Sequence, residues 1–160
     1  MKRGTFKRKL YDPSNPPTQK PRKPLAKAGK QPISKIQKKL WELCKQLTRK
    51  KYGNICYTCG QKGLEGSNWQ TGHLIPKAAI GAYLKYDLRV LRPQCYRCNI
   101  NLGGNGAEFL SRMEIRDGNE YIAQIYQDRQ KIVKAYDHYL FLIEEYTKLL
   151  NENEPRTNLL

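Results

Sequence analysis

Two pairs of cysteines constrain this chain more than any other feature. Each pair has the form Cys-x-x-Cys, Cys56 with Cys59 and Cys95 with Cys98. This spacing forms a tight turn that aims two sulfur atoms at one point, and four thiolates are the ligand set of a closed tetrahedral zinc site. The N-terminus is charged without an apolar run behind it, so we expect an intracellular setting in which disulfides are rare. We therefore predict one structural zinc ion on these cysteines.

The spacer between the two pairs is longer than that of a simple zinc ribbon. It has 35 residues, whereas the spacer of a zinc ribbon has about 15 to 20. It contains the tripeptide Gly72-His-Leu74 and, closer to the second pair, Asp87-Leu-Arg-Val-Leu91. Asn99 follows the last cysteine directly. The spacer is long enough for a hairpin that carries further functional side chains.

The order of these motifs resembles the zinc-braced branch of the HNH, or His-Me finger, nucleases. The core of that family is a ββα-metal unit, a hairpin followed by a helix. The resemblance implies that His73 is the general base, that Asp87 holds the middle bracing position, and that Asn99 binds a catalytic Mg²⁺ or Mn²⁺. The core is also similar to phage endonuclease VII, and the whole chain resembles more loosely the phage NinG/Rap recombination nucleases. The resemblance is specific from Cys56 to about Gly104.

Two positions depart from the family pattern. Members often have an aspartate metal ligand directly before the catalytic histidine, where this chain has Gly72. Gln70, Asp87 or a main-chain carbonyl could replace that ligand, and the sequence leaves these alternatives open. The middle asparagine is replaced by Asp87, which still accepts a hydrogen bond but adds a charge.

The distribution of charge points to a polyanionic partner. The net charge is +16, and residues 1–55 alone contain 17 Lys and Arg against Asp12 and Glu42. Binding such a segment to phosphates releases condensed counterions, which favours nucleic acid. The basic segment lacks the apolar face of a membrane-surface helix, and no apolar run is long enough to span a bilayer. We expect DNA as the partner, no membrane, and a cytoplasmic location in the host cell if a phage encodes the chain.

Composition divides the chain into three parts. Residues 1–32 combine six prolines with ten Lys and Arg and few apolar residues, so we predict a disordered basic arm. Residues 33–106 are expected to hold a first helix and the zinc-braced core, and residues 107–160 a helical C-terminal region. The expected fold class is α+β.

Local patterns predict the individual elements. A helix is expected over residues 34–51, with a capping box of Ser34 and Gln37, an end at Gly53, and Cys44 on its apolar stripe. Short strands are expected near residues 68–73 and 89–92. Helices are expected over residues 107–116, 119–128 with Asn119 as the cap, and 132–151. The wide apolar stripe of the last helix indicates intramolecular core, although a homodimer through the C-terminal helices is also conceivable.

These observations lead to one function hypothesis and two rivals. The favoured function is a metal-dependent DNA endonuclease that cuts branched recombination intermediates, such as Holliday junctions or D-loops, with Arg89 or Arg92 as a candidate phosphate clamp. One rival is a non-catalytic, zinc-braced DNA-binding accessory protein that acts with other recombination proteins. The other is a sequence-specific HNH nuclease of the homing or restriction type.

Overall fold

The computed structural model describes residues 30–152. The predicted basic arm therefore lies outside the described residues, except for residues 30–32, which precede the first helix without regular structure. Among the described residues, no helix is both long and apolar enough to cross a membrane.

The first helix, α1, spans Ile33–Tyr52 and buries one stripe of residues, Ile36, Leu40, Cys44 and Leu47. Its end is as predicted, because Gly53 adopts a φ of 67° and its N–H donates to the Arg49 carbonyl at 2.8 Å. The predicted capping box is wrong. Pro32 is the N-cap and no side chain caps the helix. Since the helix starts one residue before Ser34, that hydroxyl lies inside the first turn, where it cannot cap.

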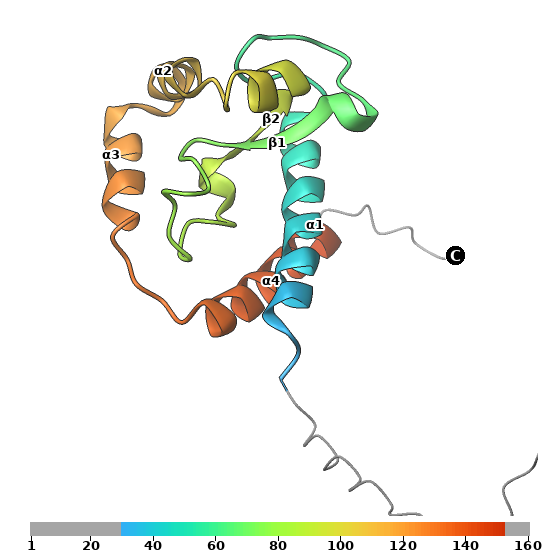
Figure 1. Ribbon diagram of the computed structural model, residues 1–160, viewed down its shortest axis with the longest axis vertical. Coiled ribbons are helices and arrows are strands. Elements are labelled where there is room, and N and C mark those ends of the chain that lie inside the picture. The colour runs from blue at the N-terminus through green and yellow to red at the C-terminus, as the bar shows by residue number, and fades with distance from the viewer. Residues whose placement is uncertain (1–29, 153–160) are drawn as a thin grey trace, which may run out of the picture. The chain divides into compact units, whose positions relative to one another are not determined.

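Two short antiparallel strands form the sheet, β1 (Trp69–His73) and β2 (Leu91–Cys95). Their register pairs Gly72 with Arg92 and His73 with Leu91. Residues 74–90 connect the strands as a long excursion that includes the short 3₁₀ turn Leu88–Val90, and Figure 1 shows this excursion below the sheet. His73 is therefore the last residue of β1, and Cys95 is the last residue of β2.

Helical elements follow the sheet. A single π-helical turn, Arg97–Asn101, comes directly after β2 and precedes α2 (Gly106–Asp117). Next come α3 (Asn119–Asp128) and α4 (Ala135–Glu152). The structure is thus an α+β fold with a small two-stranded sheet.

One further predicted cap and one predicted helix start are wrong. The bounds of α3 match the prediction, but Gly118 precedes it without any side-chain cap, so Asn119 caps nothing. The last helix starts at Ala135, and Ile132, which was expected on its apolar stripe, is 97% exposed. Ile132 and Val133 are β-branched, which makes them weak helix starters.

The main core lies where α1 packs along α4 and against β2 (Figure 1). From α4 it receives Tyr139, Leu142 and Tyr146, so the apolar stripe of this helix is intramolecular core, as its width indicated. Residues from the predicted second and third parts of the chain thus share one core. A separate small cluster, Cys56, Leu64, Trp69, Cys95 and Cys98, surrounds the paired cysteines.

Candidate functional site

The four paired cysteines meet at one point. Their sulfur atoms all lie within 4.8 Å of one another, and Cys59 Sγ is 3.7 Å from Cys95 Sγ. A tetrahedral zinc ion with Zn–S bonds of about 2.3 Å requires sulfur atoms about 3.8 Å apart. The cluster therefore fits a structural metal such as zinc. Cys44, the fifth cysteine, is buried in the main core and donates its S–H to the Tyr86 carbonyl at 3.4 Å.

One buried side chain links the cysteine cluster to the turn beside Asn99. Gln94 Nε2 donates to Thr58 Oγ1 at 3.2 Å and to the Gly104 carbonyl at 2.7 Å. The Thr58 hydroxyl in turn lies 3.3 Å from Cys56 Sγ. Because Gln94 is fully buried, these hydrogen bonds tie the position of the glycine turn to the geometry of the first cysteine pair.

His73 is half-buried at the end of β1, and its ring nitrogens have different environments. Nε2 lies 3.0 Å from the Lys85 carbonyl. A carbonyl can only accept, so the neutral ring carries its proton on Nε2 and keeps a lone pair on Nδ1. The ring also stacks on Trp41 of α1, with centroids 5.4 Å apart and planes 7° from parallel. The fold thus holds one orientation and one tautomer of His73.

Burial also sets the protonation state of His73. It lowers the pKa of the imidazole to about 4; the hydrogen bond to the Lys85 carbonyl opposes this shift, and the charges of Lys77 and Lys85 add to it. His73 is therefore neutral at pH 7, the state that can accept a proton.

This pKa shift predicts a loss of stability in acid. The unfolded chain binds the proton more tightly, with a pKa of about 6.5, so the stabilisation is complete above that pH and is lost as the pH falls toward 4. Between pH 7 and pH 5 we expect the free energy of unfolding to fall by about 2 kcal/mol more in the parent than in His73→Gln. Urea unfolding at the two pH values measures this difference, and equal decreases in both proteins would contradict the shift.

Asn99 and His73 line the same depression, although 26 residues separate them in the sequence. This depression, with a volume of about 340 Å³, also involves Thr71 of β1 and the glycine turn at residues 103–104. Asn99 lies in the turn Arg97–Asn101, and none of the described residues hydrogen-bonds its side chain. Thr71 Oγ1 is buried there and likewise has no partner among the described residues. The depression therefore combines a neutral imidazole with one uncommitted amide oxygen, and the unpartnered Thr71 hydroxyl is buried beside it.

Gly72 is required by its neighbour on β2. A Cβ atom at this position would overlap the side-chain oxygen of Gln94. Gln94 therefore fills the space in which an aspartate side chain at position 72 would start. An acidic ligand directly before His73, as many HNH nucleases have, does not fit this packing.

A family model, described as the bacteriophage lambda NinG protein, matches residues 2–155. The chain belongs to the NinG family. No curated protein and no solved structure matches it. The family match covers both cysteine pairs, His73 and Asn99, and thus the whole candidate site of this NinG-family protein.

The other predicted site residues of the NinG-family chain lie outside this depression. Asp87 caps the turn Leu88–Val90, where it accepts from the Arg89 backbone N–H at 2.8 Å and from the Arg89 guanidinium at 2.7 Å. It lies two residues after Lys85, the partner of His73, so it stabilises the segment that orients the imidazole. Gln70 donates to the Ser67 carbonyl. Neither side chain lines the depression of Asn99.

Neither candidate arginine clamp is free to bind phosphate. Arg89 pairs with Asp87 and with Asp128, the latter at 2.8 Å. Arg92 is only 1% exposed, donates to three main-chain carbonyls and pairs with Asp117 at 3.3 Å. The Arg89 guanidinium therefore connects the turn Leu88–Val90 to α3, and that of Arg92 connects β2 to α2.

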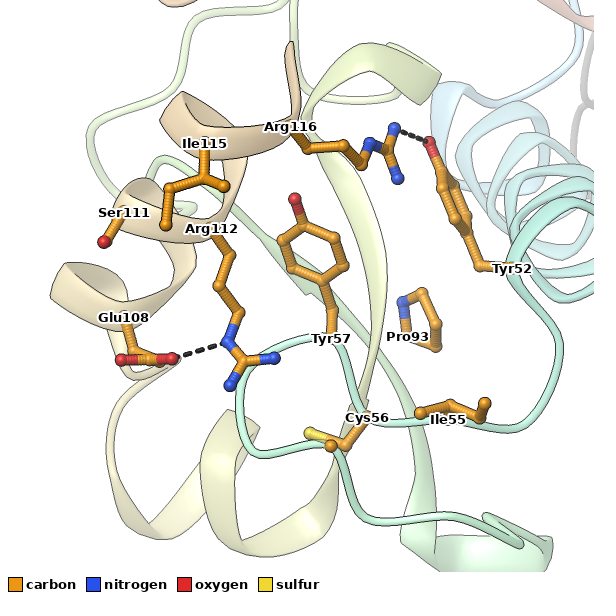
Figure 2. Close-up of a pocket in the computed structure, with 11 residues that line it drawn as sticks. Tyr52, Ile55, Cys56, Tyr57, Pro93, Glu108, Ser111, Arg112, Ile115 and Arg116 are labelled. Atoms are coloured by element: carbon orange, nitrogen blue, oxygen red, sulfur yellow. Dashed lines mark hydrogen bonds and ion pairs between the residues drawn. The ribbon is translucent and has the colours of Figure 1, made fainter. Parts of the chain in front are cut away.

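A larger depression, of about 570 Å³, lies between the first cysteine pair and α2 (Figure 2). Neither His73 nor Asn99 lines it. Its two α2 arginines have partners: Arg112 pairs with Glu108, and Arg116 with Asp117, while also donating to the Tyr52 hydroxyl at 3.3 Å. This depression offers neither a free base nor an unpaired cation, so we place the candidate site at His73.

Sequence reasoning missed three residues that shape the site, namely Trp41, Lys85 and Gln94. Alternation along β2 could have placed Gln94 and Gly72 on one face, because residues of paired strands share faces at alternate positions. No local signal could have paired Trp41 or the Lys85 carbonyl with His73, since these contacts join segments 32 and 12 residues away.

Proposed function

We propose that this NinG-family protein is a metal-dependent DNA endonuclease. The observation that carries the proposal is the shared depression of His73 and Asn99, in which the imidazole is neutral and keeps a lone pair on Nδ1. The ββα-metal assignment is part of this proposal, with β1, β2 and the turn Arg97–Asn101 as its elements.

In this mechanism His73 is the general base. Nδ1 accepts a proton from a water molecule as that water attacks a DNA phosphorus atom. The Lys85 carbonyl keeps the opposite nitrogen protonated and would stabilise the imidazolium that forms. The ring does not need to turn during the step, because Trp41 and the carbonyl already hold it.

Asn99 is the candidate ligand of a divalent metal ion. Its amide oxygen is a ligand of the hard kind that Mg²⁺ accepts. The Thr71 hydroxyl oxygen is of the same kind, and it would have to turn out of its buried position to reach an ion. A bound Mg²⁺ would supply Lewis-acid stabilisation of the phosphate and of the leaving oxygen. No carboxylate lines this depression, so most of the negative charge near the ion has to come from the DNA phosphate. We therefore expect weak metal binding without DNA.

The direct test is cleavage of end-labelled linear, forked and four-way DNA by the purified protein. We expect cutting with Mg²⁺ or Mn²⁺ and none without a divalent ion. The family membership is the reason to include branched DNA, since we propose a role in phage recombination. Preferential cutting of forked or four-way DNA would support that role, whereas cutting of one linear sequence would favour the restriction-like alternative.

The second candidate function is non-catalytic DNA binding in recombination. It is favoured by one observation, the replacement of the acidic ligand by Gly72 and the resulting absence of a carboxylate from the lining of the depression. This candidate predicts tight binding of branched DNA with no cutting under any metal condition.

A homodimer would suit either function. Its candidate contacts are Leu140 and Phe141 of α4, which are 42% and 57% exposed.

A further inference from the structure

A second depression, of about 300 Å³, lies on another side of His73. It is lined by Lys38 and Trp41 of α1 and by Lys77 and Lys85 of the segment that connects β1 to β2. His73 and Lys77 both line this depression as well as the one that contains Asn99. Any group bound here would therefore lie next to the proposed reaction centre.

Within the described residues, the charge of this depression is uncompensated. None of their acidic residues lines it, and none of its three lysines pairs with one of their carboxylates. Cations that converge without a counter-charge repel one another, so an anion bound among them lowers the free energy.

Aromatic rings hold two of the ammonium groups in place. Lys77 Nζ lies 4.8 Å from the Trp41 ring centroid, and Lys85 Nζ lies 5.6 Å from that of Tyr86. Such contacts favour a cation over the ring face and reduce the freedom of long side chains. Trp41 is itself held against His73. The cations are therefore arranged around the depression before any ligand arrives.

We propose that this depression binds a DNA backbone phosphate that neighbours the one being cut, with Lys38, Lys77 and Lys85 as its cations. The inference rests on the proposed nuclease function for the identity of its ligand. The strand would then cross His73, with one phosphate at the Asn99 side and the next at the lysine side. Contacts of this kind position the strand without reading its sequence.

The test compares two triple variants with the same change in net charge. The site variant carries Lys38→Gln, Lys77→Gln and Lys85→Gln. The control variant carries Lys50→Gln, Lys62→Gln and Lys134→Gln, three exposed lysines that do not line the depression. Binding of labelled four-way and duplex DNA is measured by fluorescence anisotropy at several KCl concentrations without added divalent ion, so that cutting does not intervene.

We expect the site variant to bind DNA about tenfold more weakly at about 0.1 M KCl, because it loses the contact to one phosphate. Its slope of log affinity against log salt should become shallower by about 0.9, the change expected for one lost phosphate contact. The control should change much less. An equal weakening of the two variants, or no weakening of either, would overturn the proposal.

A kinetic measurement separates this inference from the proposed function. With Mg²⁺, the site variant should show a KM raised by about the factor by which its DNA affinity falls, because a phosphate that does not react is bound equally in the ground state and the transition state. A parent protein that never cuts would remove the nuclease function and leave the binding comparison valid. A parent that cuts, together with a site variant that binds like the control, would overturn only the phosphate site.

Discussion

Replacement of Cys95 by serine is expected to remove the zinc ion and unfold the centre of the protein. Cys95 ends β2, is 1% exposed and belongs to the small cluster with Leu64 and Trp69. That cluster has too few apolar residues to hold two loops and a short sheet alone. Structural zinc sites contribute on the order of 10 kcal/mol to folding, which is as large as the whole stability of a typical domain.

Two measurements check this prediction. Elemental analysis of the parent should give one zinc per chain, and Cys95→Ser should retain little or none. Circular dichroism and urea unfolding should then show loss of cooperative structure. Cys44→Ser is the matched control, because it makes the same chemical change at a buried cysteine outside the cluster. It should keep its zinc, since a serine hydroxyl can still donate to the Tyr86 carbonyl. A folded parent without metal would show that the cluster is not a zinc site.

Replacement of His73 by alanine is expected to abolish DNA cutting while zinc content and DNA affinity stay close to those of the parent. Loss of a general base costs about 10² to 10⁴ in rate. Extra Mg²⁺ should not restore activity, because the missing group does not bind the metal. Added imidazole should restore part of it, since removal of the ring leaves space beside Trp41. In the parent, the rate should not fall until the pH approaches the imidazole pKa of about 4.

Asn99 variants separate the metal ligand from the base. Asn99→Ala should lower the rate and recover partly at high Mg²⁺, because it weakens metal binding and leaves His73 in place. Asn99→Asp should bind the ion more tightly than the parent, since a carboxylate replaces an amide. Mn²⁺ titration of each protein provides a readout that does not depend on cutting. The catalytic proposal fails if His73→Ala cuts as fast as the parent, or if no variant changes metal affinity.

Most of the local structure was predictable from the sequence. The spacing of the cysteine pairs predicted the four-cysteine cluster, and the cluster is confirmed. The spacing was informative because a tight turn within each pair points its two sulfur atoms in one direction. The four helices were predicted from apolar periodicity, whereas the side-chain caps assigned to Ser34 and Asn119 are wrong. The roles of His73, Asp87 and Asn99 came from family resemblance and stay predictions.

The sequence by itself therefore determined the helices and the two cysteine pairs, because these depend on residues a few positions apart. Only the tertiary structure decided the orientation and tautomer of His73 and the space around Gly72. The Lys85 carbonyl selects the tautomer of His73, Trp41 fixes its ring, and Gln94 excludes a side chain at Gly72. It also decided that Arg89 and Arg92 serve the fold through Asp128 and Asp117. Each of these contacts joins segments far apart in the chain, so it exists only after α1, the sheet and the C-terminal helices have packed together.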